Sequence, residues 1–161
     1  MYDRILVPLD GSKIGEAALP YVEGLVSKLA PGTKVEVALL QVVSSLTHYV
    51  VAGGEDMASV PIAYTEKEIE RFKKEALEYL DKAGEGLRSK GAVVNIVVGV
   101  GGSAEEILRV ADDLKVDLVA MSTHGRSGLS RWAFGSAADR VLRGGKTPVL
   151  MVRAPREAGK A

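Results

Sequence analysis

The chain has 161 residues, of which 47% are hydrophobic and 5% aromatic, enough for one domain with a mostly aliphatic core and too few for two ordinary domains. It contains no cysteine, which excludes disulfides, thiolate metal sites and cysteine nucleophiles. Lysine plus arginine and aspartate plus glutamate balance at 21 each, which argues against a protein built mainly to hold DNA or an acidic membrane.

The N-terminus, MYDRILVPLDGS, reaches charged residues and a turn too early for a secretory signal. No apolar stretch approaches the length of about 18 residues that indicates a membrane-spanning helix. We therefore expect a cytoplasmic protein. We predict one domain over residues 1–153, followed by a flexible tail over residues 154–161.

The first part of the chain alternates strand and helix patterns. The apolar run Ile5–Leu9 predicts a strand that ends at the turn Asp10-Gly11-Ser12, where Ser12 is placed to cap the following helix. That helix is predicted to run to about Leu29 and to end at Pro31-Gly32. The next strand is predicted over Val35–Val43.

Residues 44–64 contain glycine and serine without a clear period, so we predict a loop that could act as a lid. Thr65 and Glu68 then stand at the spacing of a capping box and open a long amphipathic helix to about Ser89. Gly91 lies just beyond the predicted end of this helix.

The alternation continues to the end of the domain. A second capping-box spacing, Ser103 with Glu106, predicts the start of another helix. The predicted elements are a third strand over Ala92–Val100, a helix over Ser103–Asp113, a fourth strand over Asp117–Met121, a helix over Gly135–Leu142 and a fifth strand over Val149–Val152.

Short apolar strands joined by helices predict an α/β fold, a doubly wound parallel sheet with helices on both faces. We expect the strand order 3-2-1-4-5. In such sheets ligands bind beyond the carboxyl ends of the strands, where the strand order reverses. That crevice would lie between the first and fourth strands, with Asp10 on one side of it.

Two glycine motifs are weak candidates for phosphate binding. Gly144-Gly145-Lys146-Thr147 ends like a P-loop, but a helix precedes it and a strand follows, the reverse of the P-loop order. We interpret it as a helix stop. Residues 99–104, GVGGSA, match the dinucleotide pattern G-x-G-x-x-A, but the next strand ends without the acidic residue that this pattern requires. We interpret these glycines as a tight turn.

Polar residues at the strand ends are the other candidates. Asp10 can cap the turn after the first strand, or it can accept hydrogen bonds from ribose hydroxyls or hold a metal ion. His48 lies in the predicted loop. His124 has no acidic residue or second histidine nearby that would make a metal site or a proton relay, so it can line a pocket or contact a phosphate.

Residues 121–140, MSTHGRSGLSRWAFGSAADR, are rich in glycine and serine and carry three arginines. Gly125 and Gly135 allow the backbone to approach a ligand closely. Gly135-Ser136 stands where a helix is predicted to begin, so its free N–H groups and dipole can face an anion. Arg126 and Arg131 can add charge-assisted hydrogen bonds. These parts suit a phosphate chain, and a loop that only turns the chain is the alternative.

The sequence resembles the universal stress protein family along essentially the whole chain. The matching segments are YDRILVPLDGS, VALLQVV, GGSAEEIL, VDLVAMSTHGRSGLSRWAFGSAADRVL and TPVLMV. The family's nucleotide-binding signature is G-x2-G-x9-G-(S/T). Here Gly125, the nine residues 126–134 and Gly135-Ser136 match its spacing, whereas Ser122 replaces its first glycine.

The resemblance implies a pocket for ATP or AMP, accompanied by Mg²⁺ where Asp10 takes part in binding a metal. Asp10 would also contact the ribose, the backbone of Val42 would read the adenine edge, and His124 would lie in the same segment as the phosphate contacts. The residues implied at this pocket are Pro8, Leu9, Asp10, Val42, Met121, Ser122, His124, Gly125, Arg126, Gly135, Ser136 and Ala137.

The family commonly dimerises through its last strand, and the apolar strand Val149–Val152, with no later strand to cover it, suits edge-to-edge pairing with a second copy. The resemblance thus implies a homodimeric, nucleotide-binding regulatory protein of the stress response. Two alternatives stay open: a ligand-free interaction module, and a slow ATP hydrolase. The chain offers no P-loop lysine and no clear general base, so we expect at most weak ATPase activity.

Overall fold

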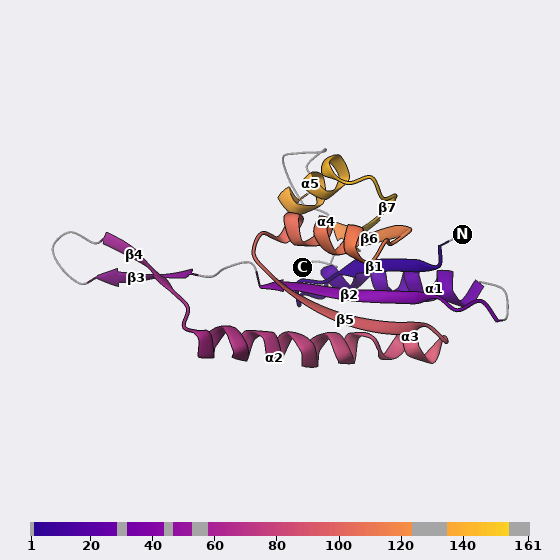
Figure 1. The fold of residues 1–161 in the computed structure, drawn as a ribbon, viewed down its shortest axis with the longest axis horizontal. Coiled ribbons are helices and arrows are strands. Elements are labelled where there is room, and N and C mark those ends of the chain that lie inside the picture. The colour runs from indigo at the N-terminus through magenta and orange to yellow at the C-terminus, as the bar shows by residue number, and fades with distance from the viewer. Residues whose placement is uncertain (1, 29–31, 44–46, 53–57, 124–134, 155–161) are drawn as a thin grey trace, which may run out of the picture.

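The computed structural model describes residues 2–28, 32–43, 47–52, 58–123 and 135–154. Its centre is a five-stranded parallel sheet with the order β5-β2-β1-β6-β7 (Figure 1). Counted along these five strands, the order is 3-2-1-4-5, so the predicted topology is confirmed. The strands are β1 (Arg4–Pro8), β2 (Glu36–Val43), β5 (Val93–Val100), β6 (Leu118–Thr123) and β7 (Val149–Arg153).

Helices cover both faces of this sheet, because each strand alternates its side chains between two cores. On β1, Ile5 and Val7 enter the core shared with α1, α2 and α3, whereas Leu6 enters the core shared with α4 and α5. Figure 1 shows α2 and α3 on one side of the sheet and α4 and α5 on the other. Their bounds are α1 (Leu19–Lys28), α2 (Glu66–Ala83), α3 (Glu85–Ser89), α4 (Ser103–Asp113) and α5 (Ser136–Gly144), with a 3-10 turn, η1 (Gly15–Ala18), before α1.

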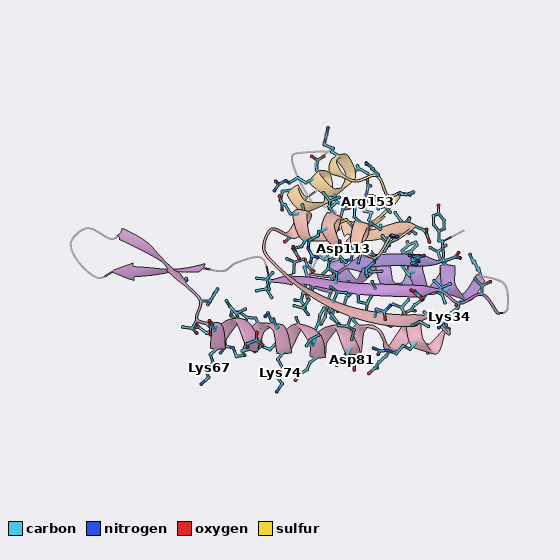
Figure 2. The ribbon with its side chains drawn as sticks, in the orientation of Figure 1. Lys34, Lys67, Lys74, Asp81, Asp113 and Arg153 are labelled. Carbon is cyan, nitrogen blue, oxygen red and sulfur yellow. The ribbon has the colours of Figure 1, made fainter. Side chains whose placement is uncertain are left out.

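The helix α2 shows the amphipathic pattern that the sequence predicts. Ala76 and Leu80 are buried against the sheet, and Figure 2 shows Lys67, Lys74 and Asp81 pointing away from it. These three residues are seven apart, close to two helical turns, so they share the outer face. Within the part of the chain that the structure describes, no helix is long and apolar enough to cross a membrane.

The prediction of a structureless loop over residues 44–64 is wrong. The chain forms two antiparallel strands there, β3 (Thr47–Ala52) and β4 (Ala58–Ala63), paired from Thr47 opposite Ala63 to Ala52 opposite Ala58. In Figure 1 this hairpin extends beyond the end of β2, away from the main sheet. The sequence pattern concealed it because both runs are short and Pro61 argues against a strand interior. The hairpin's role as a lid stays a prediction.

Three predicted boundaries also need correction. The helix expected directly after Ser12 begins with a turn and η1, and Ser12 Oγ accepts a hydrogen bond from the Gly15 N–H at 2.9 Å. The long helix over 65–89 is divided at Gly84, which packs so close to the sheet that a Cβ there would lie 2.9 Å from Val94 Cγ1. Ala154, predicted in the tail, is buried, while residues 155–161 lie outside the described residues.

Only one of the two predicted capping boxes is present. Thr65 caps α2, since its Oγ1 accepts from the Glu68 N–H at 3.3 Å and the Glu68 carboxylate accepts from the Thr65 N–H at 2.8 Å. At α4 the capping position is Gly102, without a side-chain cap, and Ser103 is already helical. The preceding Gly101 has φ +134°, a conformation that favours glycine. The helix covers the predicted residues 103–113, but Gly102, not Ser103, stands at its capping position.

We predict that Thr65→Ala lowers the free energy of unfolding by about 1 kcal/mol, because α2 loses its cap. Ser103→Ala is the matched control and should change it by less than about 0.5 kcal/mol, since no cap is lost. Urea unfolding followed by circular dichroism measures both values. Equal losses in the two variants would contradict the assignment of the caps.

Candidate functional site

A cavity of about 360 Å³ opens at the carboxyl ends of the central strands. It lies where β1 and β6 are neighbours, and the helices that follow these two strands pack on opposite faces of the sheet, α1 after β1 and α5 after β6. This is the switch point at which doubly wound sheets bind ligands. Its lining residues are Pro8, Leu9, Asp10, Gly15, Leu40, Val42, Ser103, Ile107, Met121, Ser122, Thr123, Gly135, Ser136, Ala137 and Ala138.

The structure thus brings most of the predicted site residues into one cavity. Those that line it are Pro8, Leu9, Asp10, Val42, Met121, Ser122, Gly135, Ser136 and Ala137. His124, Gly125 and Arg126 lie outside the described residues, as does Arg131, and nothing is described of the side chain of His48. The expected crevice between the first and fourth strands is therefore present.

Sequence reasoning missed several lining residues. Leu40 follows from strand periodicity, because it shares a face of β2 with Val42. Ser103 follows from its place at the carboxyl end of a neighbouring strand. Gly15 and Ile107 carried no signal, since only the packing of η1 and α4 over the strand ends brings them to the cavity. The remaining two missed residues are Thr123 and Ala138.

Asp10 is held in one orientation by the turn that follows β1. Its Oδ1 accepts hydrogen bonds from the Ser12 N–H at 2.9 Å and from the Ser12 hydroxyl at 2.6 Å. The residue is exposed, and among the described residues its Oδ2 accepts no hydrogen bond. One carboxylate oxygen therefore caps the turn, as predicted, and the other has no hydrogen-bond partner among the described residues, at a residue that lines the cavity.

Gly15 completes this turn by leaving room for the carboxylate. A Cβ at Gly15 would collide with Oδ1 of Asp10 and would lie 3.2 Å from its Cγ. Any other residue at this position must displace the carboxylate from Ser12 or move η1. The glycine is therefore required by the position of Asp10.

Ser122 lies at the end of β6, opposite Val152 of β7. Its hydroxyl donates a hydrogen bond of 2.9 Å to the carbonyl oxygen of Gly15. The proton that a serine hydroxyl offers is thus used within the protein, and what Ser122 presents to the cavity is an acceptor oxygen.

Tyr79 of α2 supports the turn after β1 from the helix layer that also contains α1. Its hydroxyl donates to the Glu16 carboxylate at 3.0 Å. Burial raises the pKa of Tyr79 well above its ordinary value, and the hydrogen bond to Glu16 and the negative charges of Glu16 and Asp10 raise it further, whereas a backbone hydrogen bond with Gly11 acts in the opposite direction. The phenol therefore stays protonated and remains a donor.

The start of α5 forms the opposite wall of the cavity. Gly135 is its capping residue, with φ −55° and ψ 151°, and within the described ranges no side chain caps the first turn. The N–H groups of the next three residues, Ser136 to Ala138, therefore need a partner from outside the helix. Their dipoles and the Ser136 hydroxyl make this wall suitable for an anion.

The glycines of residues 99–104 make room for acidic side chains. Gly99 and Gly102 lie against the carboxylates of Glu106 and Glu105, which would collide with a Cβ at either glycine. The Arg109 guanidinium, hydrogen-bonded to Glu106, holds the pKa of that carboxyl below its usual range. Ionised acids packed against these glycines oppose an anion, so residues 99–104 do not suit a dinucleotide.

Gly145 follows α5 directly and ends it. Its N–H donates to the carbonyl of Val141 at 3.0 Å, and β7 begins at Val149. The interpretation of residues 144–147 as a helix stop is confirmed, and they do not form a P-loop.

Comparison with known proteins agrees with this geometry. The sequence model of the "Universal stress protein family" matches residues 1–153. The chain belongs to the universal stress protein family. It is 31% identical to universal stress protein YxiE of Bacillus subtilis, over 95% of this chain and 100% of that protein. It is 29% identical to universal stress protein MJ0577 of Methanocaldococcus jannaschii, over 95% of this chain and 96% of the relative.

Solved structures of family members have the same fold. The structure of MJ0577 superposes with a TM-score of 0.71 at 26% identity, covering 98% of this chain and 99% of that one. A universal stress protein in complex with cAMP superposes at 0.63 with 19% identity, covering 96% and 98% of the two chains. One from Archaeoglobus fulgidus in complex with dAMP superposes at 0.59 with 20% identity, covering 93% and 97%.

We predict that Gly15→Ala weakens the fold, because the new Cβ takes the space of the Asp10 carboxylate and breaks its bonds to Ser12. The expected loss is about 1–3 kcal/mol of unfolding free energy. Gly24→Ala in α1 is the matched control: its Cβ would meet nothing within 4 Å, so a gain of about 0.4–1 kcal/mol is expected. Chemical unfolding measures both, and an unchanged stability of Gly15→Ala would contradict the packing described.

Proposed function

We propose that this family member is a cytoplasmic regulatory protein of the stress response that binds an adenine nucleotide, ATP or AMP, in the cavity at the ends of β1 and β6. The observation that carries the proposal is the pairing of two complementary walls around one space. A carboxylate that accepts hydrogen bonds lines one side, and an uncapped helix N-terminus lines the other. A nucleoside phosphate needs both kinds of partner.

The lining residues suggest how the ligand lies. Leu40, Val42 and Ile107 are apolar and suit the flat adenine ring. Asp10 would accept hydrogen bonds from the ribose hydroxyls through the oxygen that Ser12 does not use. Gly135, Ser136 and Ala137 would surround the phosphates, and we propose that His124, Gly125 and Arg126 add to that end of the site.

The size of the cavity supports this proposal. Its volume of about 360 Å³ lies within the range of roughly 300–1,000 Å³ of small-molecule sites. Two proteins of the same fold hold cAMP and dAMP in their solved structures. In the described residues no group of three or more acidic or histidine side chains gathers to bind a metal ion. We propose that Mg²⁺, where it takes part, binds together with the phosphates and that Asp10 shares it.

We predict that ATP or AMP binds the nucleotide-free protein and that Asp10→Asn weakens binding roughly 10- to 100-fold, because a charged acceptor is lost from the ribose. Isothermal titration calorimetry measures both affinities. Asp81→Asn is the matched control, since Asp81 lies on the outer face of α2 in an ion pair with Arg88, and it should bind as the wild type does.

The absence of binding heat at millimolar ATP and AMP would contradict the proposed function. A ligand-free interaction module would then be favoured. Mass spectrometry of the denatured protein, as first purified, is an independent check, because a tightly bound nucleotide would be carried through purification.

We further propose that the protein acts as a homodimer paired through β7. This strand lies at the edge of the sheet, and its residues Val149, Leu150 and Met151 remain partly exposed. An apolar strand edge of this kind pairs readily with a second copy. An isologous contact of edge with edge closes on itself and stops at two subunits.

Light scattering on the eluting protein should give twice the mass of one chain for the wild type. Leu150→Lys should shift the protein toward the mass of one chain, because a lysine on an edge strand opposes pairing. Leu142→Lys is the control, since Leu142 is 43% exposed on α5, and it should stay dimeric. A wild-type protein with the mass of one chain would contradict the dimer.

A further inference from the structure

Ser122 is linked to Asp10 through the backbone of Gly15 and the side chain of Ser12. The Ser122 hydroxyl donates to the Gly15 carbonyl at 2.9 Å, and the N–H of the same Gly15 donates to Ser12 Oγ at 2.9 Å. The Ser12 hydroxyl in turn donates to Oδ1 of Asp10 at 2.6 Å. Ser122 therefore fixes the position of Gly15, and Gly15 helps to fix the side chain that holds Asp10.

We propose that Ser122 is a positioning residue, whose hydroxyl holds the turn after β1 so that Asp10 is set for the ribose. The inference rests on the proposed nucleotide binding and assigns a role to the serine that replaces the first glycine of the family signature. Ser122 acts through Gly15 and Ser12. It stabilises the geometry of the site before the ligand arrives, which reduces the ordering cost of binding.

The geometry around the turn supports a positioning role. The turn is exposed at Asp10 and Gly11, so packing around these two residues does little to hold it, and contacts from neighbouring elements support it. Tyr79 supplies it from α2 through Glu16. Ser122 supplies it from β6, on the side of the cavity. The turn is thus attached to two different elements of the fold.

A glycine at position 122, as in the family signature, has no hydroxyl and could not donate a hydrogen bond to the Gly15 carbonyl. The alternative role for Ser122 is an obstruction, in which its side chain occupies space that the ligand would use. The two roles predict opposite signs for Ser122→Gly. Positioning predicts weaker nucleotide binding in this variant, and obstruction predicts tighter binding.

The first test needs no nucleotide. Hydrogen exchange followed by NMR reports on the N–H groups of Ser12 and Gly15, which donate to Asp10 and Ser12. Ser122→Ala should speed their exchange roughly 3- to 10-fold, the range that one hydrogen bond supports. Ser89→Ala is the control, because it removes a similar bond to the Gly86 carbonyl in α3. Unchanged exchange in Ser122→Ala would overturn the proposal whether or not nucleotide binds.

The second test compares ATP with 2′,3′-dideoxy-ATP by calorimetry. Ser122→Ala and Ser122→Gly should weaken ATP binding roughly 3- to 10-fold and leave the dideoxy analogue nearly unchanged. Ser122→Thr keeps the hydroxyl and should restore the preference for ATP. An equal loss for both ligands would mean a merely structural role, and tighter ATP binding by Ser122→Gly would mean obstruction; either result overturns the proposal. A wild type that binds neither ligand would overturn the proposed function, and with it the ribose role, while the exchange test still decides whether Ser122 holds the turn.

Discussion

The chain leaves β1 through a turn whose shape depends on one oxygen atom, Oδ1 of Asp10, which accepts from both the N–H and the hydroxyl of Ser12. That arrangement requires a glycine at position 15, because a side chain there would collide with the carboxylate. The same turn places η1 beside the strand ends, where the carbonyl oxygen of Gly15 accepts a hydrogen bond from the Ser122 hydroxyl. The orientation of Asp10, the path of the chain into α1 and the near wall of the cavity therefore depend on the same few contacts.

The far wall has a different physical origin. The next described element after β6 is α5, which packs on the face of the sheet opposite α1, and no side chain of the described residues caps its first turn. Since β1 and β6 are neighbours, their opposite crossovers leave a space between them. A parallel sheet with helices on both faces creates such a space wherever its strand order reverses. The specific residues then decide its chemistry: an acid on one wall and free N–H groups on the other.

Three glycine-containing segments look alike as sequence and differ in the folded protein. At residues 99–102 the glycines make room for the carboxylates of Glu105 and Glu106, which pack directly against that helix start. Gly145 ends α5 by donating to Val141. Gly135 instead begins a helix where, among the described residues, no side chain caps the first turn and no carboxylate packs against the glycine. The local pattern of glycines is therefore a poor guide to anion binding, and the position of the acids around each helix start decides it.

The family, the α/β class, the strand order and most of the residues at the cavity could be predicted from the amino-acid sequence, because buried strands, helix starts and the spacing of the family signature are visible as local patterns in the chain. It did not reveal the hairpin β3–β4, whose runs are short and interrupted by a proline, nor the break at Gly84, which packs closely against Val94. Ser103 illustrates the same limit, since Gly102 of the preceding turn takes its expected capping place. The hydrogen bond from Ser122 to Gly15 is visible only in the folded chain, because the two residues are 107 positions apart and no local pattern connects them.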